Sequence, residues 1–402
     1  MSEQGRPPLE GLRVLDLSRI IAGPFCTMQL ADLGAEIIKI ELPGSGDDSR
    51  KFKPPAQGGE SHFYLAYNRN KKSVALDLKG EAGREVLHAL AAQCQVLVEN
   101  FRPGVMARLG LDYAAMKARH PQLIYCSISS YGQQGIMADR PGLDPVLQAE
   151  MGMMALTGEP EGVPTRHPMS LNDLFSGLYA STAILAAVTV QRQTGQGQQL
   201  ELSLMGSALA VMSNYAQYCF ASGEDPPRMG NTHLAAAPVG LFHARDGAFY
   251  LACGTDRLFN KVCTEVLQRP EICEDPRFIA NTGRVKHREE LFALLNDAFG
   301  SDSLESWLKK MRSAGVAAGP VRTVSQALAS PEVQESGMIT SVPHPTAGDL
   351  RMIGTPYRFS DTPPAEPVAP PLLGEHTEEV LRGLLGMDSA ELARLREAGA
   401  IP

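Results

Sequence analysis

Asp173 is the carboxylate of this sequence whose surroundings point most directly to chemistry. It stands in the stretch Leu171–Gly177, at the start of a long apolar segment with helical spacing. The positive end of a helix keeps a partly buried carboxylate ionised, and such a carboxylate in a dry site is a usable nucleophile toward an activated acyl group. The position also suits a helix cap, because Asp accepts hydrogen bonds from the unpaired N–H groups at a helix start. The residues alone leave both roles open.

A second candidate site is the segment Val98–Gly104, which Arg108 follows. It comes after an expected strand, and ligands bind beyond the carboxyl ends of strands in parallel sheets. Phe101 between two arginines offers a ring face for an adenine and positive charge for its phosphates. A solvated surface loop explains the same residues equally well.

Several common chemistries lack the residues they need. The turn Ser18–Gly23 has bulky side chains where a dinucleotide-binding fingerprint needs glycines, so we expect no NAD site, although Glu41 ends the second strand as a ribose-binding acid would. No phosphate-binding G-x-x-x-x-G-K loop, G-x-S-x-G elbow or H-E-x-x-H motif occurs. The nine histidines do not cluster at ligand spacing, so we expect no metal.

The composition excludes further classes of protein. The chain has 402 residues, 44% of them hydrophobic, and a net charge of −8, which argues against nucleic-acid binding through bulk charge. The start lacks a signal peptide's basic and apolar parts, and no apolar run of about 18 residues without polar interruption predicts a membrane span. Seven scattered cysteines indicate reduced thiols, and hence a cytoplasmic protein.

Elements that could position these residues alternate along the first half of the chain. Apolar strands are expected at 12–17, 36–41, 74–78, 96–99 and 123–129, and helices at 25–33, 81–92 and 113–119. This alternation predicts a parallel sheet wound with helices. Further elements are expected as helices at 173–192, 205–221 and 377–385, a strand at 199–203, and a hairpin at 242–254 that turns at Asp246-Gly247. A proline-rich, extended stretch covers 343–371.

The order of these motifs resembles the class III CoA-transferases, the superfamily that includes formyl-CoA transferase and alpha-methylacyl-CoA racemase. Seven stretches match in the family's order from about Leu9 to Leu385: LEGLRVLDLSRIIAGPFCTMQLADLGAEIIKIE, NRNKKSVALDLKG, VLVENFRPGVMARLGLDY, LIYCSISSYGQQG, the Asp173 segment, TGQGQQLELSL and PPLLGEHTEEVL. The resemblance implies an α/β protein with a Rossmann-like large domain, built from the N-terminal half and the C-terminal tail. It also implies a smaller inserted domain and an interlocked homodimer. We expect the large domain at 1–222, the small domain at 223–325, and the linker and return at 326–402.

The resemblance also implies a mechanism in which Asp173 matches the nucleophilic aspartate. Asp173 would attack a donor acyl-CoA and give a mixed anhydride and a CoA thiolate. The thiolate would then attack the aspartyl carbonyl and form an aspartyl-CoA thioester. An acceptor carboxylate would reverse these steps, with no need for ATP.

Positions that match the family's coenzyme A contacts fall in four segments. Those near the thioester are Ile20, Ile21 and Ala22, and those along the cofactor are Leu76, Asp77, Leu78 and Lys79. Those at the nucleotide and its phosphates are Asn100, Phe101, Arg102 and Arg108, and those over the pantetheine are Asp139, Arg140, Pro141, Gly142 and Leu143. For Ile20, Leu76 and Leu78, packing in the core explains the residue types at least as well.

Three positions depart from relatives. Leu42 stands where several have an arginine that touches the adenosine, and Arg69, Lys71 or Lys72 would have to replace it. Ile21 stands where formyl-CoA transferase has a glutamine, which argues against oxalate or formate specificity. The pair Leu143-Asp144 lacks the racemase's histidine, and leucine cannot move a proton. Asp144 stays a candidate acid or orienting group, or a turn residue before Pro145.

We therefore expect a cytoplasmic, homodimeric CoA-transferase that moves CoA from a donor such as succinyl-CoA to a small organic or dicarboxylic acid. Arg166, Arg228 and the segment Gly230–His233 are expected near the acceptor. Two alternatives stay open: a racemase or isomerase on the same scaffold, and a non-catalytic CoA-binding protein in which Asp173 is a helix cap.

Overall fold

The computed structural model describes residues 5–402. The chain forms two compact units. Unit 1 comprises the described residues up to Met151 together with His167–Ala216 and Gln334–Pro402, and unit 2 comprises Gly152–Arg166 and Gln217–Val333. The sequence predicts domain limits at 1–222, 223–325 and 326–402. These limits stay a prediction.

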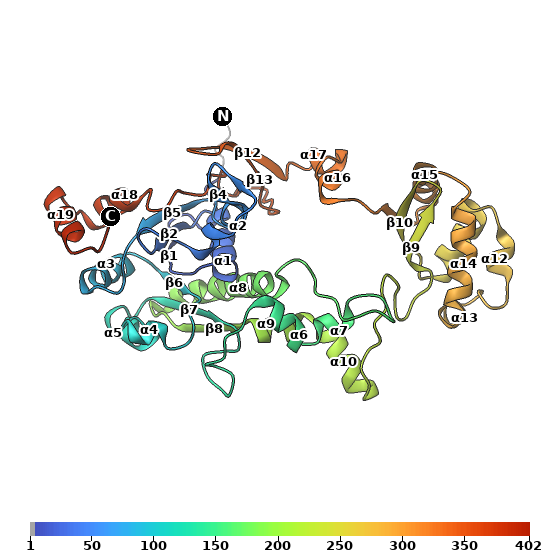
Figure 1. The fold of residues 1–402 in the computed structure, drawn as a ribbon, viewed down its shortest axis with the longest axis horizontal. Coiled ribbons are helices and arrows are strands. Elements are labelled where there is room, and N and C mark those ends of the chain that lie inside the picture. The colour runs from blue at the N-terminus through green and yellow to red at the C-terminus, as the bar shows by residue number, and fades with distance from the viewer. Residues whose placement is uncertain (1–4) are drawn as a thin grey trace. The chain divides into compact units, whose positions relative to one another are not determined.

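Unit 1 is built on a six-stranded sheet in which every pairing is parallel (Figure 1). The strand order is β5-β2-β1-β6-β7-β8, with bounds β1 Arg13–Asp16, β2 Glu36–Glu41, β5 Lys71–Ala75, β6 Val96–Glu99, β7 Ile124–Ser129 and β8 Gln199–Ser203. The parallel sheet wound with helices that the sequence predicts is confirmed. Strand order reverses at β1, whose neighbours are β2 and β6, and ligands of open α/β sheets bind beyond the carboxyl ends at such a point.

Helices cover both faces of the sheet, and its strands β1, β2, β6 and β7 are buried along almost their whole length. On one face, Val14, Val96 and Ile124 form a core with helices α1 (Ala22–Asp32) and α8 (Leu171–Thr194). On the other, Leu15 and Leu97 pack with helices that include α3 (Glu81–Ala91), α5 (Tyr113–Arg119), α18 (Thr377–Leu385) and α19 (Ser389–Glu397). Successive strand residues therefore point into opposite cores.

Helix α8 is the one helix within residues 5–402 that is long and apolar enough, by length and composition alone, to cross a membrane. The sequence predicts a helix at 173–192 but no membrane span, because Ser, Thr and Gln interrupt its apolar residues. Its Ala180, Ile184 and Ala187 are buried in the core beside α1, so in unit 1 it is packed as a core helix.

Several expected element bounds were wrong. Strand β5 begins at Lys71 rather than residue 74, because two lysines start it and Lys71 is buried. The helix expected at 205–221 is broken into α9 (Leu204–Val211) and α10 (Ser213–Ser222). The hairpin turns at residues 245–246, one residue earlier than expected. Helix α19 was not expected.

The C-terminal tail runs along the edge of strand β5 (Figure 1). Thr377 Oγ1 accepts a hydrogen bond of 3.0 Å from Ala75 N, and Gly374 N donates one of 2.8 Å to Ser73 Oγ. The tail thus covers an exposed sheet edge, which would otherwise be free to pair with another strand. The remaining elements that lie within unit 1 are η1 Asp48–Lys51, β3 Ala56–Gln57, β4 Glu60–Ser61, α2 His62–Tyr67, α4 Val105–Arg108, α6 Asp144–Glu150, β12 Ile339–His344 and β13 Gly348–Ile353.

Unit 2 has a separate core around a three-stranded antiparallel sheet in the order β11-β10-β9. Phe242 and Phe249 of that sheet both pack edge-on against Phe299, which in turn meets the ring of Trp307 edge-on. Its elements are α7 Met153–Leu156, β9 Val239–Ala244, β10 Gly247–Ala252, α11 Asp256–Lys261, η2 Val262–Val266, α12 Pro270–Glu274, α13 Asn281–Lys286, α14 Arg288–Phe299, α15 Leu304–Ala314, β11 Ala317–Pro320 and α16 Val324–Leu328. Helices α10 and α17 (Pro331–Glu335) span its limits.

Candidate active site

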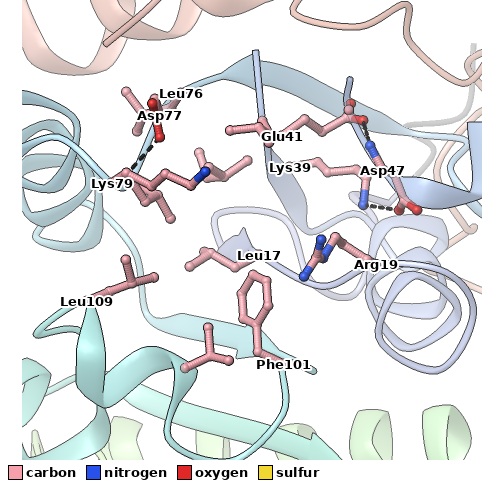
Figure 2. Close-up of a pocket in the computed structure, with 15 residues that line it drawn as sticks. Leu17, Arg19, Lys39, Glu41, Asp47, Leu76, Asp77, Lys79, Phe101 and Leu109 are labelled. Carbon is pink, nitrogen blue, oxygen red and sulfur yellow. Dashed lines mark hydrogen bonds and ion pairs between the residues drawn. The ribbon is translucent and has the colours of Figure 1, made fainter. Parts of the chain in front are cut away.

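Two adjoining cavities of unit 1 lie at the carboxyl ends of β1, β2 and β6. The first, here the apolar cavity, has a volume of about 230 Å³ and is shown in Figure 2. Its lining residues are Leu17, Arg19, Lys39, Ile40, Glu41, Leu42, Gly46, Asp47, Leu76, Asp77, Leu78, Lys79, Phe101, Val105 and Leu109. The second, here the aspartate cavity, has a volume of about 530 Å³ and includes Asp173 in its wall. Arg19 and Phe101 line both cavities, so the two adjoin at these side chains.

The loop between β1 and α1 forms the wall that the two cavities share. Asn100, directly after β6, accepts a hydrogen bond from Arg19 N and donates one to Arg19 O, each 2.8 Å long. A Cβ on Gly23 would lie 2.1 Å from Ser18 Cβ, so only glycine lets the loop fold back on itself there. Asn100, which the sequence placed at the nucleotide, therefore also fixes this loop.

Arg19 is a site residue that the sequence analysis did not single out. Its guanidinium Cζ lies 4.6 Å from the centroid of the Phe101 ring, and Nη1 lies 3.2 Å from Asp48 Oδ2. Figure 2 shows the two side chains together at one side of the apolar cavity. A cation stacked on an aromatic ring between two cavities suits an anionic or planar ligand. The usable signal was its place in the loop after β1, at the reversal of strand order.

Asp173 is the third residue of helix α8 and does not cap it. The helix begins at Leu171, and Ser170 occupies the N-cap position without a side-chain cap. Among the described residues, no group donates a hydrogen bond to the Asp173 carboxylate. Burial, with a contribution from the nearby Asp144 charge, raises the pKa of Asp173 to about 7. The structure thus removes the helix-cap interpretation and leaves a carboxylate with little stabilisation of its charge.

Asp144 holds the start of the same helix. Its Oδ1 accepts a hydrogen bond of 2.7 Å from Asn172 N, and its Oδ2 accepts one of 2.7 Å from Gln148 Nε2. Its side chain is buried and does not line either cavity. This geometry fits an orienting group and departs from the simple turn residue that the sequence also allowed.

Tyr67, at the end of α2, is a second neighbour of Asp173 that the sequence did not reveal. Burial and the charge of Asp173 together raise the pKa of Tyr67. Its ring also meets Phe25 edge-on, with 5.9 Å between centroids. No motif distinguished this tyrosine from a core residue.

Most of the residues expected at coenzyme A line one cavity or the other. Those in the apolar cavity are Leu76, Asp77, Leu78, Lys79 and Phe101, and those in the aspartate cavity are Ile20, Ile21, Ala22, Asn100, Phe101, Arg102, Arg140, Pro141, Gly142 and Leu143. Arg108 and Asp139 are exposed and line neither cavity. Arg140 is ion-paired with Glu150.

The cations considered as replacements for an arginine at Leu42 are engaged elsewhere. Leu42 lines the apolar cavity. Arg69 forms a buried pair with Asp32, and Lys71 bonds Asp16, Pro24 O and Asn68. Lys72 pairs with Glu36 and Glu379. Arg19 and Lys79 are instead the cationic side chains that line this cavity beside the buried Lys39.

Glu41 is likewise committed within the protein. Its two carboxylate oxygens accept hydrogen bonds from Arg50, Ser73 Oγ and Asp47 N. A ribose-binding acid needs a free carboxylate at this position, so Glu41 does not have that role here.

The residues expected near the acceptor belong to unit 2. The Arg228 guanidinium donates hydrogen bonds to the carbonyl oxygens of Ala155, Glu159 and Gly162. Arg166 is exposed, as is most of the segment Gly230–His233. Arg228 therefore has hydrogen-bond partners within its own unit, whereas no hydrogen bond or ion pair of Arg166 is found among residues 5–402.

Comparison with known proteins gives the same assignment over nearly the whole chain. The sequence profile of CoA-transferase family III matches residues 9–377. The Homo sapiens succinyl-CoA:glutarate CoA-transferase is 38% identical over 394 residues, which cover 98% of this chain and 90% of that protein. The Acetobacter aceti acetyl-CoA:oxalate CoA-transferase is 38% identical over 368 residues, which cover 91% of this chain and 93% of that protein.

A solved structure supports the fold as well as the sequence match. The crystal structure of a CAIB/BAIF family protein from Brucella suis is 38% identical and superimposes with a TM-score of 0.86. The superposition covers 94% of this chain and 100% of that one. The protein therefore belongs to CoA-transferase family III and is a CoA-transferase enzyme.

Proposed function

We propose that the protein moves CoA from a donor such as succinyl-CoA to a small organic or dicarboxylic acid, through a covalent aspartyl-CoA intermediate on Asp173. The observation that carries the proposal is the Asp173 carboxylate itself. It lines the aspartate cavity, is not committed to helix capping, and has a pKa raised to about 7 by burial and by Asp144. A carboxylate that the protein does not stabilise is more basic, and so more nucleophilic toward a thioester.

Coenzyme A would lie along both cavities. Leu76, Leu78 and Phe101 give the apolar cavity a lining suited to the adenine, and the exposed Lys79 and Arg102 stand at the rim for phosphates. The pantetheine would pass Arg19 and Phe101, where the cavities meet, and bring the thioester to Asp173. Ile20, Ile21, Ala22, Asp77, Asn100, Arg140, Gly142 and Leu143 complete the proposed contacts, with Arg108 and Asp139 outside the cavities.

Each step of the proposed reaction exchanges one activated carboxyl group for another. An Asp173 oxygen bonds to the donor's acyl carbon, and the C–S bond breaks to release the CoA thiolate. The thiolate then bonds to the Asp173 side-chain carbonyl carbon, and the donor acid leaves as a carboxylate. The acceptor carboxylate enters and reverses both steps, so that Asp173 is regenerated. Because the thioester energy is kept throughout, no ATP is consumed.

The acceptor is best sought among dicarboxylic acids. The two relatives described above are named for succinyl-CoA and glutarate and for acetyl-CoA and oxalate. Ile21 in the wall of the aspartate cavity argues for a longer acid than oxalate, because it offers no hydrogen bond close to the reacting carboxylate. Arg166 and the segment Gly230–His233 stay proposed acceptor residues, and Arg228 is the weaker candidate because backbone carbonyls already occupy it.

The proposed assembly is an interlocked homodimer in the cytoplasm. Large apolar side chains stay exposed along helices α8 and α9 of the single chain, namely Leu178, Tyr179, Val190 and Leu209. Such a set favours burial against a second copy. The seven cysteines are free, and five of them are buried, which fits a reducing compartment.

The two alternatives predict different outcomes in an isotope experiment. Carbon-labelled succinate would be incubated with unlabelled succinyl-CoA and enzyme, and label would be followed into the thioester. Transfer predicts exchange that Asp173→Asn abolishes, whereas a non-catalytic CoA-binding protein gives none. A racemase or isomerase would instead take up deuterium from solvent at the alpha carbon of a branched acyl-CoA. Leu143, in the wall of the aspartate cavity, cannot move that proton.

A further inference from the structure

Ile20, in the wall of the aspartate cavity, has an unusual backbone conformation. Its φ angle is +74°, in the left-handed region. Glycine enters this region freely, but a β-branched side chain does so only when the surrounding structure imposes it. The loop has no glycine before Gly23, so something outside it must hold Ile20 in place.

A buried ion pair between Asp47 and Lys39 holds Ile20 in this conformation. Asp47 Oδ1 accepts a hydrogen bond of 3.0 Å from Ile20 N, and Oδ2 lies 2.9 Å from Lys39 Nζ. Both charged side chains are fully buried, and Figure 2 shows them facing each other beside the apolar cavity. Lys39 Nζ also donates a hydrogen bond of 2.8 Å to Ser18 O. This ion pair therefore binds the backbone of the loop on both sides of Arg19, at Ser18 O and at Ile20 N.

The charge state of this pair is stable near neutral pH. Burial opposes the ionisation of Asp47, but Lys39 and the backbone N–H groups of Ser49 and Ile20 outweigh it and hold the pKa of Asp47 below its usual range. Asp16 and Glu41 add to the field of Asp47 and keep the pKa of Lys39 above its ordinary value against the effect of burial. The hydrogen bond from Ile20 N is thus accepted by an ionised carboxylate, and such hydrogen bonds are stronger than those between neutral groups.

The conformation of Ile20 reaches Asp173 through direct packing. Ile20, Ile21 and Ala22 run in succession along the aspartate cavity. A Cβ on Gly177 would lie 2.8 Å from Ala22 O, so the loop's end and helix α8 are in close contact. Gly177 is one helical turn beyond Asp173, on the same face of the helix. The wall that begins at Ile20 therefore packs, through Ala22, directly on the helix that carries Asp173.

We propose that Asp47, paired with Lys39, is a positioning residue for the reaction: it imposes the left-handed conformation of Ile20 and thereby places the wall at Ile20–Ala22 against Asp173. This inference rests on the proposed function, because it concerns the same carboxylate. Neither Asp47 nor Lys39 is among the coenzyme A contacts that the family resemblance implies.

The test is a double-mutant cycle between positions 47 and 20. Asp47→Ala lowers kcat by about ten- to a hundredfold, because a displaced wall misplaces the thioester. In the Ile20→Gly background the same change lowers kcat by no more than about threefold, since glycine adopts a positive φ without help. Asp47→Asn, which keeps an acceptor for Ile20 N but leaves Lys39 without its partner charge, restores only part of the kcat lost in Asp47→Ala. An Asp47→Ala variant that keeps parental kcat, or an equal loss in both backgrounds, overturns the proposal.

A matched control separates positioning from general loss of stability. Asp32→Ala removes a buried ion pair of the same unit, with Arg69, whose side-chain hydrogen bonds within residues 5–402 do not involve the loop. Both variants melt at a lower temperature than the parent, but only Asp47→Ala loses kcat at a temperature where both are folded. An equal loss of kcat in Asp32→Ala contradicts a specific role for Asp47.

Amide hydrogen exchange gives a reading that needs no activity. The Ile20 amide is protected in the parent and in Asp32→Ala, and it loses protection in Asp47→Ala. Retained protection in Asp47→Ala contradicts the inference even if the proposed transfer reaction is correct. Conversely, if Asp173→Asn still exchanges label between succinate and succinyl-CoA, the proposed function is contradicted. The amide hydrogen exchange at Ile20 still shows whether Asp47 holds the loop, so the two failures can be told apart.

Discussion

The Asp144 carboxylate accepts a hydrogen bond of 2.7 Å from the backbone N–H of Asn172, the residue directly before Asp173. One acid thus satisfies the start of helix α8 and leaves the other acid free to line the aspartate cavity. The same arrangement places two carboxylates near each other, and like charges disfavour ionisation. Asp144 therefore orients the proposed nucleophile and raises its basicity.

The pH dependence of the reaction follows from the raised pKa of Asp173. Attack on a thioester needs the carboxylate, and the pKa of about 7 means that this form accumulates only as pH rises through neutrality. We expect kcat/KM for the acyl-CoA to rise about tenfold per pH unit on the acid side and to level off above about pH 7. Initial rates measured at constant ionic strength check this, and an acid limb centred near pH 4 would contradict it.

Asp144→Asn isolates the charge of Asp144 from its hydrogen bond. The amide keeps an acceptor for Asn172 N but removes the negative charge, so the pKa of Asp173 falls and the acid limb moves to lower pH by up to about one unit. It does not fall to the ordinary value, because burial is the larger cause. Asp144→Ala is the matched control: it also removes the cap, at a cost of about 1 kcal/mol in unfolding free energy. An unmoved limb in Asp144→Asn would rule out the coupling.

Asp173→Asn should stabilise the folded protein at alkaline pH. The pKa of Asp173 is raised from 3.8 to about 7 by folding, so ionisation in the folded state is unfavourable, and this lowers stability as pH rises between those values. At one pKa unit per about 1.4 kcal/mol, the gain from Asn at pH 8 is at most about 4 kcal/mol. The gain disappears only at about pH 3 and below, where Asp173 is mostly protonated in both the folded and the unfolded state. Denaturant unfolding at the two pH values measures it, and a variant less stable than the parent at pH 8 would be incompatible with it.

The contact between helices α1 and α8 can be tested by adding one methyl group. Gly177→Ala places a Cβ 2.8 Å from Ala22 O and 3.0 Å from Phe25 Cδ1. Overpacking of this kind costs about 1–3 kcal/mol, and it shifts the first turn of α8, so kcat falls as well. Gly383→Ala in helix α18 is the control, because nothing lies within 4 Å of its Cβ and alanine favours a helix. Equal behaviour of the two variants in melting and in kcat would refute a tight α1–α8 contact.

The sheet could be predicted from the sequence because its strands are apolar on both faces. Strands β1, β2, β6 and β7 were recognised in this way. Strand β5 was placed three residues late, because its buried Lys71 looks like a surface residue until Asp16 and Asn68 are known to surround it. Buried charges with partners distant in sequence are invisible to local pattern.

The candidate site, like the sheet, could be predicted from the sequence only in part. The residues around Asp173 already indicated it as a candidate. Family resemblance supplied eleven of the twenty residues that line the aspartate cavity, Asp173 included, but only five of the fifteen that line the apolar cavity. The cap of helix α8 comes from Asp144, which is 28 residues from Asn172 in sequence, so local rules could not exclude Asp173 as the cap. The left-handed Ile20 was equally hidden, because no glycine marks it and the Asp47 side chain that holds it is 27 residues away.

The central claim is that Asp173 carries CoA as a covalent thioester, and chemical trapping tests it most directly. The enzyme would be incubated with succinyl-CoA without acceptor, treated with hydroxylamine or borohydride, digested, and examined by mass spectrometry. The account predicts a hydroxamate or a reduced side chain at Asp173, dependent on succinyl-CoA and absent from Asp173→Asn. No modification at Asp173, together with full transfer activity in Asp173→Ala, would contradict it.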